Sequence, residues 1–182
     1  MNLREFNSLV DLFFYKAEKE NPNTVFLEWL NPKNKKKYTW GETSTSIQKL
    51  AKVLKENLEE GDRCLLVSEN RPEWLIADMA IMLAGGITVP AYTTYVEKDY
   101  KYLVEDCEPS VVIVSNDEMY NKLQNIIKEK DFIKKVISFD VLRNIEQKEK
   151  YIKFNSIIND QLNDTAKIKN KNLKRNSPAC II

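Results

Sequence analysis

Histidine is absent from the 182 residues of this chain. A Ser-His-Asp triad, a Cys-His pair and a histidine-ligated metal are therefore excluded within this polypeptide. No pair of Asp and Glu residues stands out as an acid/base couple, and no cluster of them has the pattern of a metal site. We therefore assign no catalytic residue and no metal ligand to the sequence.

Glycine is nearly as scarce, with 4 residues in the whole chain. A phosphate-binding loop needs glycines after a strand and before a helix, where backbone amides and the helix dipole converge. Gly85 and Gly86 lie instead after an apolar helix pattern and before a β-branched run. They predict a helix stop and a tight turn with close backbone packing, so we assign no cofactor-binding residue.

Cysteine occurs at three widely spaced positions, Cys64, Cys107 and Cys180. The odd number and the spacing argue against a disulfide framework or a Cys-x-x-Cys metal site and fit a reducing cytoplasm, our expected location. Each cysteine is expected to be a small buried apolar residue. Charge of one sign is also lacking, with 28 Lys and Arg against 27 Asp and Glu. Electrostatics therefore indicate no nucleic-acid partner.

Long hydrophobic runs are missing as well. Residues 79–95 form the longest nearly uncharged stretch, and Gly85, Gly86 and Pro90 interrupt it. It is shorter than the roughly 20 apolar residues of a membrane-spanning helix. The first five residues have no apolar core of signal-peptide length beside them. We therefore expect a chain without a transmembrane segment, whose length fits one domain.

The most apolar helix pattern begins at Pro72 and ends at Gly85. A short apolar run at 64–67 precedes it and a β-branched run at 87–90 follows it. Strand, helix and strand in this order are typical of a parallel crossover. The pattern repeats with a helix at 97–106, a strand at Val111–Val114, a helix capped by Asn116 or Asp117, and a strand at Lys135–Ser138. The sequence thus predicts an α/β fold, a doubly wound and mostly parallel sheet with helices on both faces.

An amphipathic helix precedes this unit. Its apolar residues fall at the spacing of one helical face: Phe6, Leu9, Val10, Phe13, Phe14 and Ala17. We expect this face to pack on the core of the protein. Contact with a bilayer surface, and hence peripheral membrane association, is the alternative.

Two short strand patterns follow, at 25–30 and 36–38, joined by a polar turn at 31–34, and they predict a β-hairpin. Thr39 and Glu42 then match a capping box for a helix with one apolar stripe. Gly61 is expected to end that helix in a left-handed conformation.

The last quarter of the chain changes in composition. We divide the sequence into residues 1–141, the folded α/β part, residues 142–176, a polar and partly helical linker, and residues 177–182, the start of another apolar strand. Apolar residues at 151–158 predict one short helix, and residues 163–176 resemble a mobile linker. Because chains seldom stop on the first residues of a buried strand, we expect an incomplete amino-terminal portion of a larger domain.

Several segments resemble the amino-terminal part of the adenylate-forming acyl-CoA synthetases, closest to the long-chain fatty acid branch. They are SENRPEW at 68–74, AGG at 84–86, VPAYTT at 89–94, the segment from Tyr38 to Glu42, and ACII at 179–182. The resemblance implies a ligase that uses ATP, CoA and Mg²⁺ to activate a fatty acid. In that family the phosphate-binding loop begins where this chain ends, so none of its catalytic residues can be mapped here.

In an open α/β sheet, ligands bind beyond the carboxyl ends of the strands. These ends are residues 68–70, 90–94 and 115–116. The functional hypothesis is that Tyr92, Thr93 and Thr94 help to form the wall of a substrate pocket. In the structural alternative, Ser68, Asn70 and Asn116 start helices and the two threonines form a turn.

Arg71 and Glu73 flank the helix-starting Pro72. A local, exposed ion pair or cap is the interpretation we favour for them, and such a pair contributes little stability.

Two classes of function follow from the sequence. The first is the amino-terminal portion of an ATP-dependent acyl-CoA synthetase for long-chain fatty acids, with residues 1–182 inactive on their own. The alternative is a free-standing truncated α/β module with an interaction or regulatory role. A flavodoxin-like mononucleotide binder is disfavoured because the loops after the strands lack glycine.

Overall fold

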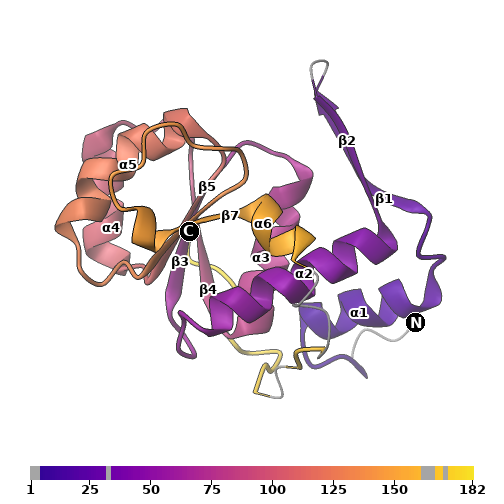
Figure 1. Ribbon diagram of the computed structural model, residues 1–182. Helices are drawn as coiled ribbons and strands as arrows, with labels where there is room; N and C mark the ends of the chain where they lie inside the picture. The colour runs from indigo at the N-terminus through magenta and orange to yellow at the C-terminus, as the bar shows by residue number, and fades with distance from the viewer. Residues whose placement is uncertain (1–4, 32–33, 161–166, 170–171) are drawn as a thin grey trace.

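The computed structural model describes residues 5–31, 34–160, 167–169 and 172–182. A five-stranded sheet in the order β4-β3-β5-β6-β7 forms the centre, and all of its neighbouring strands are parallel. A separate antiparallel hairpin, β1-β2, projects from the body (Figure 1). The strands of the large sheet are β3 (Arg63–Val67), β4 (Ile87–Ala91), β5 (Val111–Val114), β6 (Lys135–Ser138) and β7 (Tyr151–Lys153). The predicted α/β fold is confirmed.

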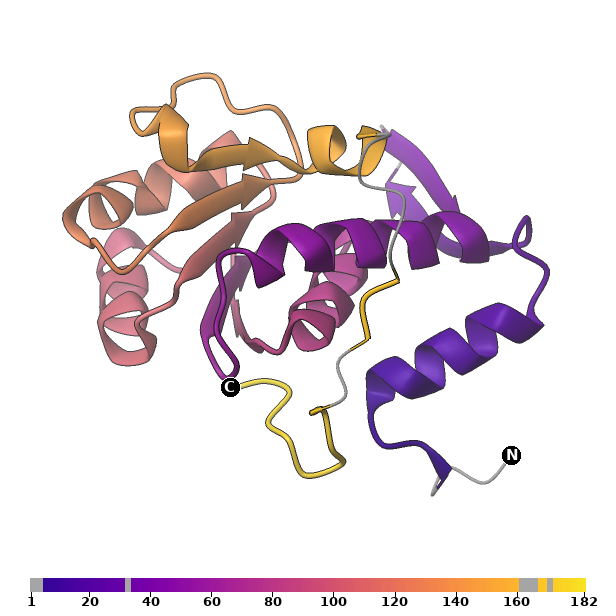
Figure 2. The same ribbon diagram turned by 60° about the horizontal axis from the view of Figure 1, so that its bottom comes forward.

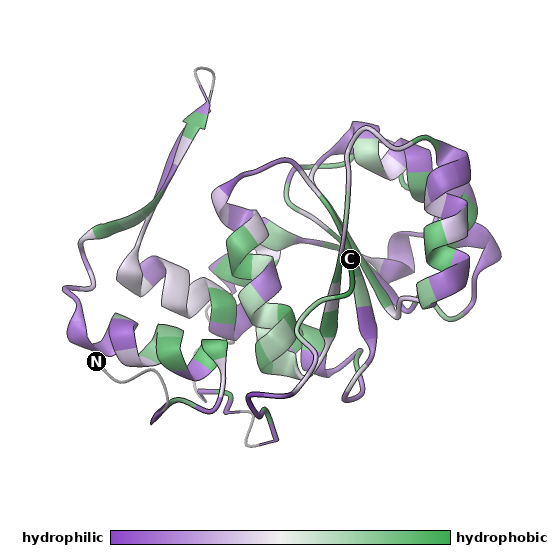
Figure 3. Ribbon diagram, turned by 180° about the vertical axis from the view of Figure 1, so that it is seen from behind, coloured by the Kyte–Doolittle hydropathy of each residue, from purple (hydrophilic) through white to green (hydrophobic). Residues whose placement is uncertain are grey.

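Helices cover both faces of the sheet. The helices α4 (Glu97–Cys107) and α5 (Asp117–Glu129) lie on one face, and α2 (Trp40–Lys55) and α3 (Pro72–Ala84) lie on the other (Figure 1). Side chains alternate along each strand, so that Leu65 and Val67 join the core under α4 and α5 while Cys64 and Leu66 join the core under α2 and α3. Figure 3 shows mainly apolar strands at the centre of the molecule, between the helices.

The helix α3 is buried on nearly all sides, as its sequence predicts. It ends at Gly85, whose φ of 94° is the left-handed conformation that glycine adopts at little cost. A Cβ on Gly86 would lie 3.1 Å from Leu58 and 3.3 Å from the carbonyl oxygen of Asp62. The predicted helix stop with close backbone packing is therefore confirmed.

The amino-terminal helix α1 (Leu9–Lys19) packs on the protein's own core. Val10 and Phe13 are buried, and the Phe13 ring lies 5.8 Å from the rings of both Phe26 and Trp40. The predicted inner face is wrong for Leu9, which lies at the start of α1 and is 58% exposed. The hairpin is confirmed as β1 (Val25–Asn31) and β2 (Asn34–Thr39). Residues 32–33 of its expected turn lie outside the described residues.

Three local expectations are wrong. The helix α2 ends at Lys55, and Gly61 has its positive φ of 87° in the turn before β3 instead. Tyr151 and Ile152 do not begin a helix. They belong to β7, which pairs with β6, and the short helix α6 (Phe154–Asn159) starts only after it. Cys180 is exposed, whereas Cys64 and Cys107 are buried as expected.

The carboxyl-terminal segment forms one bridge where a buried strand was expected. The amide of Thr88 donates to the carbonyl oxygen of Ala179 at 3.0 Å, and the amide of Ile181 donates to that of Thr88 at 3.0 Å. Cys180 thereby pairs in parallel with Thr88 of the edge strand β4. Cys180 is exposed. Residues 161–166 and 170–171 of the expected linker lie outside the described residues, and the proposed domain limits stay a prediction.

Within the described ranges, no helix is both long and apolar enough to cross a bilayer.

The capping box at the start of α2 gives a direct test of local stability. The amide of Glu42 donates to the Thr39 hydroxyl at 3.1 Å, and the amide of Thr39 donates to the Glu42 carboxylate at 2.8 Å. We expect Thr39→Ala to lower the free energy of unfolding by about 1 kcal/mol, and Thr39→Ser to stay close to the unsubstituted chain because it keeps the oxygen. Urea denaturation followed by circular dichroism measures both. Equal losses in the two variants would contradict the cap.

Candidate functional site

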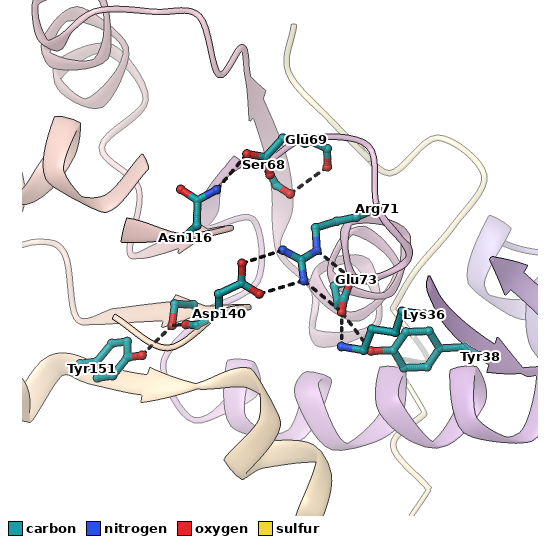
Figure 4. A network of polar contacts seen from close by, with 10 residues as sticks. Lys36, Tyr38, Ser68, Glu69, Arg71, Glu73, Asn116, Asp140 and Tyr151 are labelled. Atoms are coloured by element: carbon teal, nitrogen blue, oxygen red, sulfur yellow. Dashed lines mark hydrogen bonds and ion pairs between the residues drawn. The ribbon is translucent and has the colours of Figure 1, made fainter. Parts of the chain in front are cut away.

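The carboxyl ends of β3 and β5 lie side by side and form the centre of the candidate site. The strand order places β3 between β4 and β5, and the loops after β3 and β5 lead to helices on opposite faces. This is the topological switch point at which open α/β sheets bind ligands. The Asn116 side-chain amide joins the two loops by donating to the Glu69 carboxylate at 2.9 Å (Figure 4).

The polar residues of these loops take different roles from one another. Asn116 caps α5 by accepting from the Met119 amide at 3.1 Å, as expected. The expectation that Ser68 and Asn70 start a helix is wrong, because the cap position of α3 is Arg71. The Ser68 hydroxyl donates instead to the adjacent carbonyl oxygen of Glu69 at 2.8 Å.

Two further serines lie at the ends of β5 and β6. The Ser138 hydroxyl donates to the carbonyl oxygen of Asp140 at 2.6 Å and also lies 2.6 Å from the Tyr151 hydroxyl. The Ser115 hydroxyl is buried and has no hydrogen-bond partner among the described residues. The ends of β5 and β6 therefore present uncharged hydroxyl groups at this edge of the sheet.

Tyr92, Thr93 and Thr94 follow β4 at the same edge. Thr93 and Thr94 form a turn, and the Tyr92 side chain is 70% exposed. Neighbouring helices fix the backbone here: the Tyr100 hydroxyl donates to the carbonyl oxygen of Tyr92 and the Lys122 ammonium to that of Thr93, each at 2.7 Å. Burial is the main cause that raises the pKa of Tyr100 to about 12, so its hydroxyl stays a donor. The substrate-binding role of the three residues stays a prediction.

A network of ion pairs lies beside this edge and is centred on the buried Arg71 and Glu73, while the side chains of Lys36 and Asp140 are 37% and 51% exposed. Its guanidinium group donates to the Glu73 carboxylate at 2.8 and 3.3 Å and to the Asp140 carboxylate at 3.0 and 3.2 Å (Figure 4). The Glu73 carboxylate also accepts from the Tyr38 hydroxyl at 3.1 Å and from the Lys36 ammonium. Four segments of the chain thus meet: the hairpin, the start of α3, and the ends of β3 and β6.

Aromatic rings complete the surroundings of Arg71. Its guanidinium carbon lies 4.6 Å from the centre of the Trp29 ring and 5.4 Å from that of Phe139. Because the guanidinium group is more weakly hydrated than an ammonium, it suits such stacked and buried positions. The side chain of Arg71 is 3% exposed and that of Glu73 is 0% exposed. The expected ion pair exists, but the expectation that it is exposed is wrong.

The pKa values in the network follow from burial and pairing. Burial opposes the charge of Glu73, but hydrogen bonds from Arg71 and Lys36 outweigh it and lower the pKa of this carboxyl from 4.5 to about 2. Burial, and then the charge of Glu73, raises the pKa of Tyr38. Burial opposes the charge of Arg71 as well, and the bonds to Glu73 and Asp140 outweigh it and raise the pKa of Arg71. All of these groups keep their charge state near neutral pH.

The charged residues of this site stabilise the fold and do not form a catalytic centre. Two cations, Lys36 and Arg71, face two anions, Glu73 and Asp140, so the charges balance. In the residues that the structure describes, no three His, Cys, Asp or Glu side chains lie together as metal ligands. The strand order is that of flavodoxin-type mononucleotide binders. The loops after β3 and β5 nevertheless have no glycine, and the Glu69 carboxylate there disfavours a phosphate. The structure therefore does not favour a nucleotide phosphate at this edge.

Sequence reasoning missed Lys36, Tyr38 and Asp140 as partners of the Arg71 and Glu73 pair. They lie 35 to 69 residues away along the chain. Local patterns carry no signal for such contacts. The only local hint is Arg71-Pro72-Glu73 itself, where two opposite charges surround a helix start.

The Glu73 carboxylate should make stability depend on pH. Its pKa is lower in the folded chain than in the unfolded one, so its stabilisation is complete above about pH 4.5 and is lost as the pH falls toward about 2. Removing its charge leaves Arg71 buried with too little compensation. We expect Glu73→Gln to cost about 3 kcal/mol at pH 7 and less at low pH, measured as urea midpoints. Glu28→Gln, which breaks the exposed pair with Lys37, is the matched control and should cost less than about 1 kcal/mol. Equal costs for the two variants would contradict the network's role.

The family model described as AMP-binding enzyme matches residues 14–182. Human acyl-coenzyme A synthetase ACSM3, a mitochondrial protein, is 28% identical over 121 residues, which are 61% of this chain and 20% of that protein. The rat long-chain-fatty-acid–CoA ligase ACSBG1 is 26% identical over 131 residues, which are 71% of this chain and 18% of that protein. The chain thus spans about a fifth of the length of these curated relatives.

Solved structures share the fold. The anthranilate CoA ligase AuaEII, solved in complex with anthranoyl-AMP, superposes with a TM-score of 0.72 at 20% identity, over 93% of this chain and 32% of that one. A putative long-chain-fatty-acid CoA ligase from Rhodopseudomonas palustris gives a TM-score of 0.70 at 18% identity, over 88% of this chain and 38% of that one. At such identities the likeness concerns the fold alone. The family model nevertheless matches nearly the whole sequence, and the chain therefore belongs to the family of AMP-binding enzymes.

Proposed function

We propose that this chain is the amino-terminal part of an ATP-dependent acyl-CoA synthetase. The observation that carries the proposal is the match of the AMP-binding enzyme model over residues 14–182. In the reaction, a carboxylate attacks the α-phosphate of ATP to give an acyl-adenylate and pyrophosphate. The thiol of CoA then displaces AMP to give the thioester.

The substrate we propose is a long-chain fatty acid. The relatives named long-chain-fatty-acid–CoA ligase, ACSBG1 of the rat and FadD15 of Mycobacterium tuberculosis, support this choice. The segments SENRPEW and VPAYTT of this chain resemble the same branch. Acyl-coenzyme A synthetase ACSM3, with a similar identity, makes acids of other lengths the competing substrates.

The residues that the structure describes offer no recognisable site for ATP or Mg²⁺. No carboxylate cluster for a metal exists in the described ranges, and neither Gly85 nor Gly86 lies between a strand and a following helix. We therefore place the ATP, Mg²⁺ and CoA sites of the enzyme mainly on other parts of the protein. In this proposal, residues 1–182 form a rigid scaffold. Their turn from Tyr92 to Thr94 forms one wall of the substrate pocket. Free cysteines support a reducing location, which we propose is the cytoplasm.

Pyrophosphate exchange tests the activity. The protein expressed in its longest natural form should exchange labelled pyrophosphate into ATP with hexadecanoate, and more slowly with octanoate and anthranilate. Residues 1–182 alone should show no exchange, because the proposal places the nucleotide site mainly on other parts of the protein. Exchange with anthranilate only would contradict the long-chain substrate. Exchange by residues 1–182 alone would contradict their role as a scaffold, and no exchange by any form would favour the non-catalytic α/β module.

A pair of tyrosines tests the wall of the substrate pocket. Tyr92 and Tyr102 are 70% and 71% exposed, so truncating either removes little packing. In the active protein we expect Tyr92→Ala to raise the KM for the acid or for CoA by about threefold or more, the loss of one modest contact. Tyr102→Ala, on the outer side of α4, should leave both KM values unchanged. The prediction is wrong if the two variants behave alike.

A further inference from the structure

The turn after β4 receives little support from the sheet itself. The strand β4 lies at the edge of the sheet, and its pairing with β3 ends at Ala91, where the turn begins. Within the turn, the Tyr95 amide donates to the carbonyl oxygen of Tyr92 at 3.2 Å. The position of the turn relative to the rest of the protein therefore depends on side chains that reach it from other elements.

Two helices reach the turn, at two successive carbonyl groups. The Tyr100 hydroxyl of α4 donates to the carbonyl oxygen of Tyr92, and the Lys122 ammonium of α5 donates to that of Thr93, each at 2.7 Å. The helices α4 and α5 lie side by side, on the opposite face of the sheet from α2 (Figure 2). The turn is thereby attached to both helices of that face.

The two attachments differ in what else the side chain does. Tyr100 is fully buried and is part of the core under α4 and α5, so it serves packing as well as the turn. The side chain of Lys122 is 27% exposed, and its ammonium lies 3.4 Å from the carboxylate of Glu118, one turn earlier on α5. A charged donor forms a stronger hydrogen bond than a neutral one. Replacing Lys122 therefore releases the turn with the smaller disturbance of the core.

The ring of Tyr92 depends on the backbone of the turn. Its centre lies 5.5 Å from that of the Tyr95 ring in an edge-on contact, and the Tyr95 ring lies 5.9 Å from that of Tyr100. Tyr92 itself is 70% exposed. A displacement of the Thr93 carbonyl group therefore moves an exposed ring and leaves the buried one in place.

We propose that Lys122 is a positioning residue for the substrate pocket, whose ammonium group holds the turn from Tyr92 to Thr94 where the turn contacts the acid. The inference rests on the proposed function, which makes this turn one wall of the pocket. In this role Lys122 acts through the backbone of Thr93 and does not touch the reacting atoms. Its loss changes the affinity for the acid and not the chemical step.

Hydrogen exchange of the 182-residue chain tests the position of the turn without any activity. Lys122→Met keeps the length of the side chain and removes its charge, and water can then bind the carbonyl group of the half-buried Thr93. We expect the Tyr95 amide to exchange about fivefold faster or more, which corresponds to the loss of one hydrogen bond. Lys128→Met is the matched control on the same helix and should leave this amide unchanged, because Lys128 pairs with Glu146 instead.

Kinetics of the longest natural form test the role in the pocket. We expect Lys122→Met to raise the KM for hexadecanoate about threefold or more and to leave kcat and the KM for ATP unchanged. Lys122→Arg keeps a donating cation and should restore most of the affinity, and Lys128→Met should match the unsubstituted protein. Urea midpoints show that each variant is folded. A merely structural role of Lys122 would lower the urea midpoint and leave the KM unchanged.

Three results would overturn the proposal. They are unchanged hydrogen exchange of the Tyr95 amide in Lys122→Met, faster hydrogen exchange with an unchanged KM for hexadecanoate, and equal effects of Lys122→Met and Lys128→Met. Absence of pyrophosphate exchange in every form of the protein would overturn the proposed function and, with it, a role in the pocket. Hydrogen exchange does not depend on activity, so it distinguishes this failure from a failure of Lys122 to hold the turn.

Discussion

The buried ion pairs of Arg71 hold together parts of the protein that the chain itself keeps far apart. Removing two charges from water costs several kcal/mol for each ion, so such a group persists only where every charge is paired. Arg71 and Lys36 meet Glu73 and Asp140 in equal numbers, and the rings of Trp29 and Phe139 cover the guanidinium group. The hairpin, which as two isolated strands would be marginally stable, is thereby fixed against the sheet.

The helix α3 explains why the network is placed here. It is buried along most of its length, and Pro72 and Glu73 of its first turn are buried with it. A helix start leaves backbone amides without partners and favours negative charge, which Glu73 supplies. A buried carboxylate then requires cations, and these come from Arg71 and from the hairpin. Apolar packing of one helix thus determines where the polar contacts lie.

Polar and apolar surfaces are separated along the strands. The carboxyl ends of β3 and β5 meet at the switch point, where the loops carry serine, asparagine and glutamate. The opposite end of β4 adjoins a mainly apolar cavity between α1, α3 and the carboxyl-terminal segment. The chain belongs to the AMP-binding enzymes, and a rigid core that positions ligand-binding loops agrees with this family. We expect the first surface to serve the reaction.

The sequence by itself determined the type and order of most elements, since these depend on neighbours along the chain. The Thr39 and Glu42 cap, Asn116, and the stop at Gly85 and Gly86 are local patterns, and each is present as expected. Only the tertiary structure decided that Tyr151 joins the sheet, that Leu9 is exposed, and that the Arg71 pair is buried. Burial and strand pairing depend on residues distant in sequence. No local pattern records which of those residues fold back to exclude water.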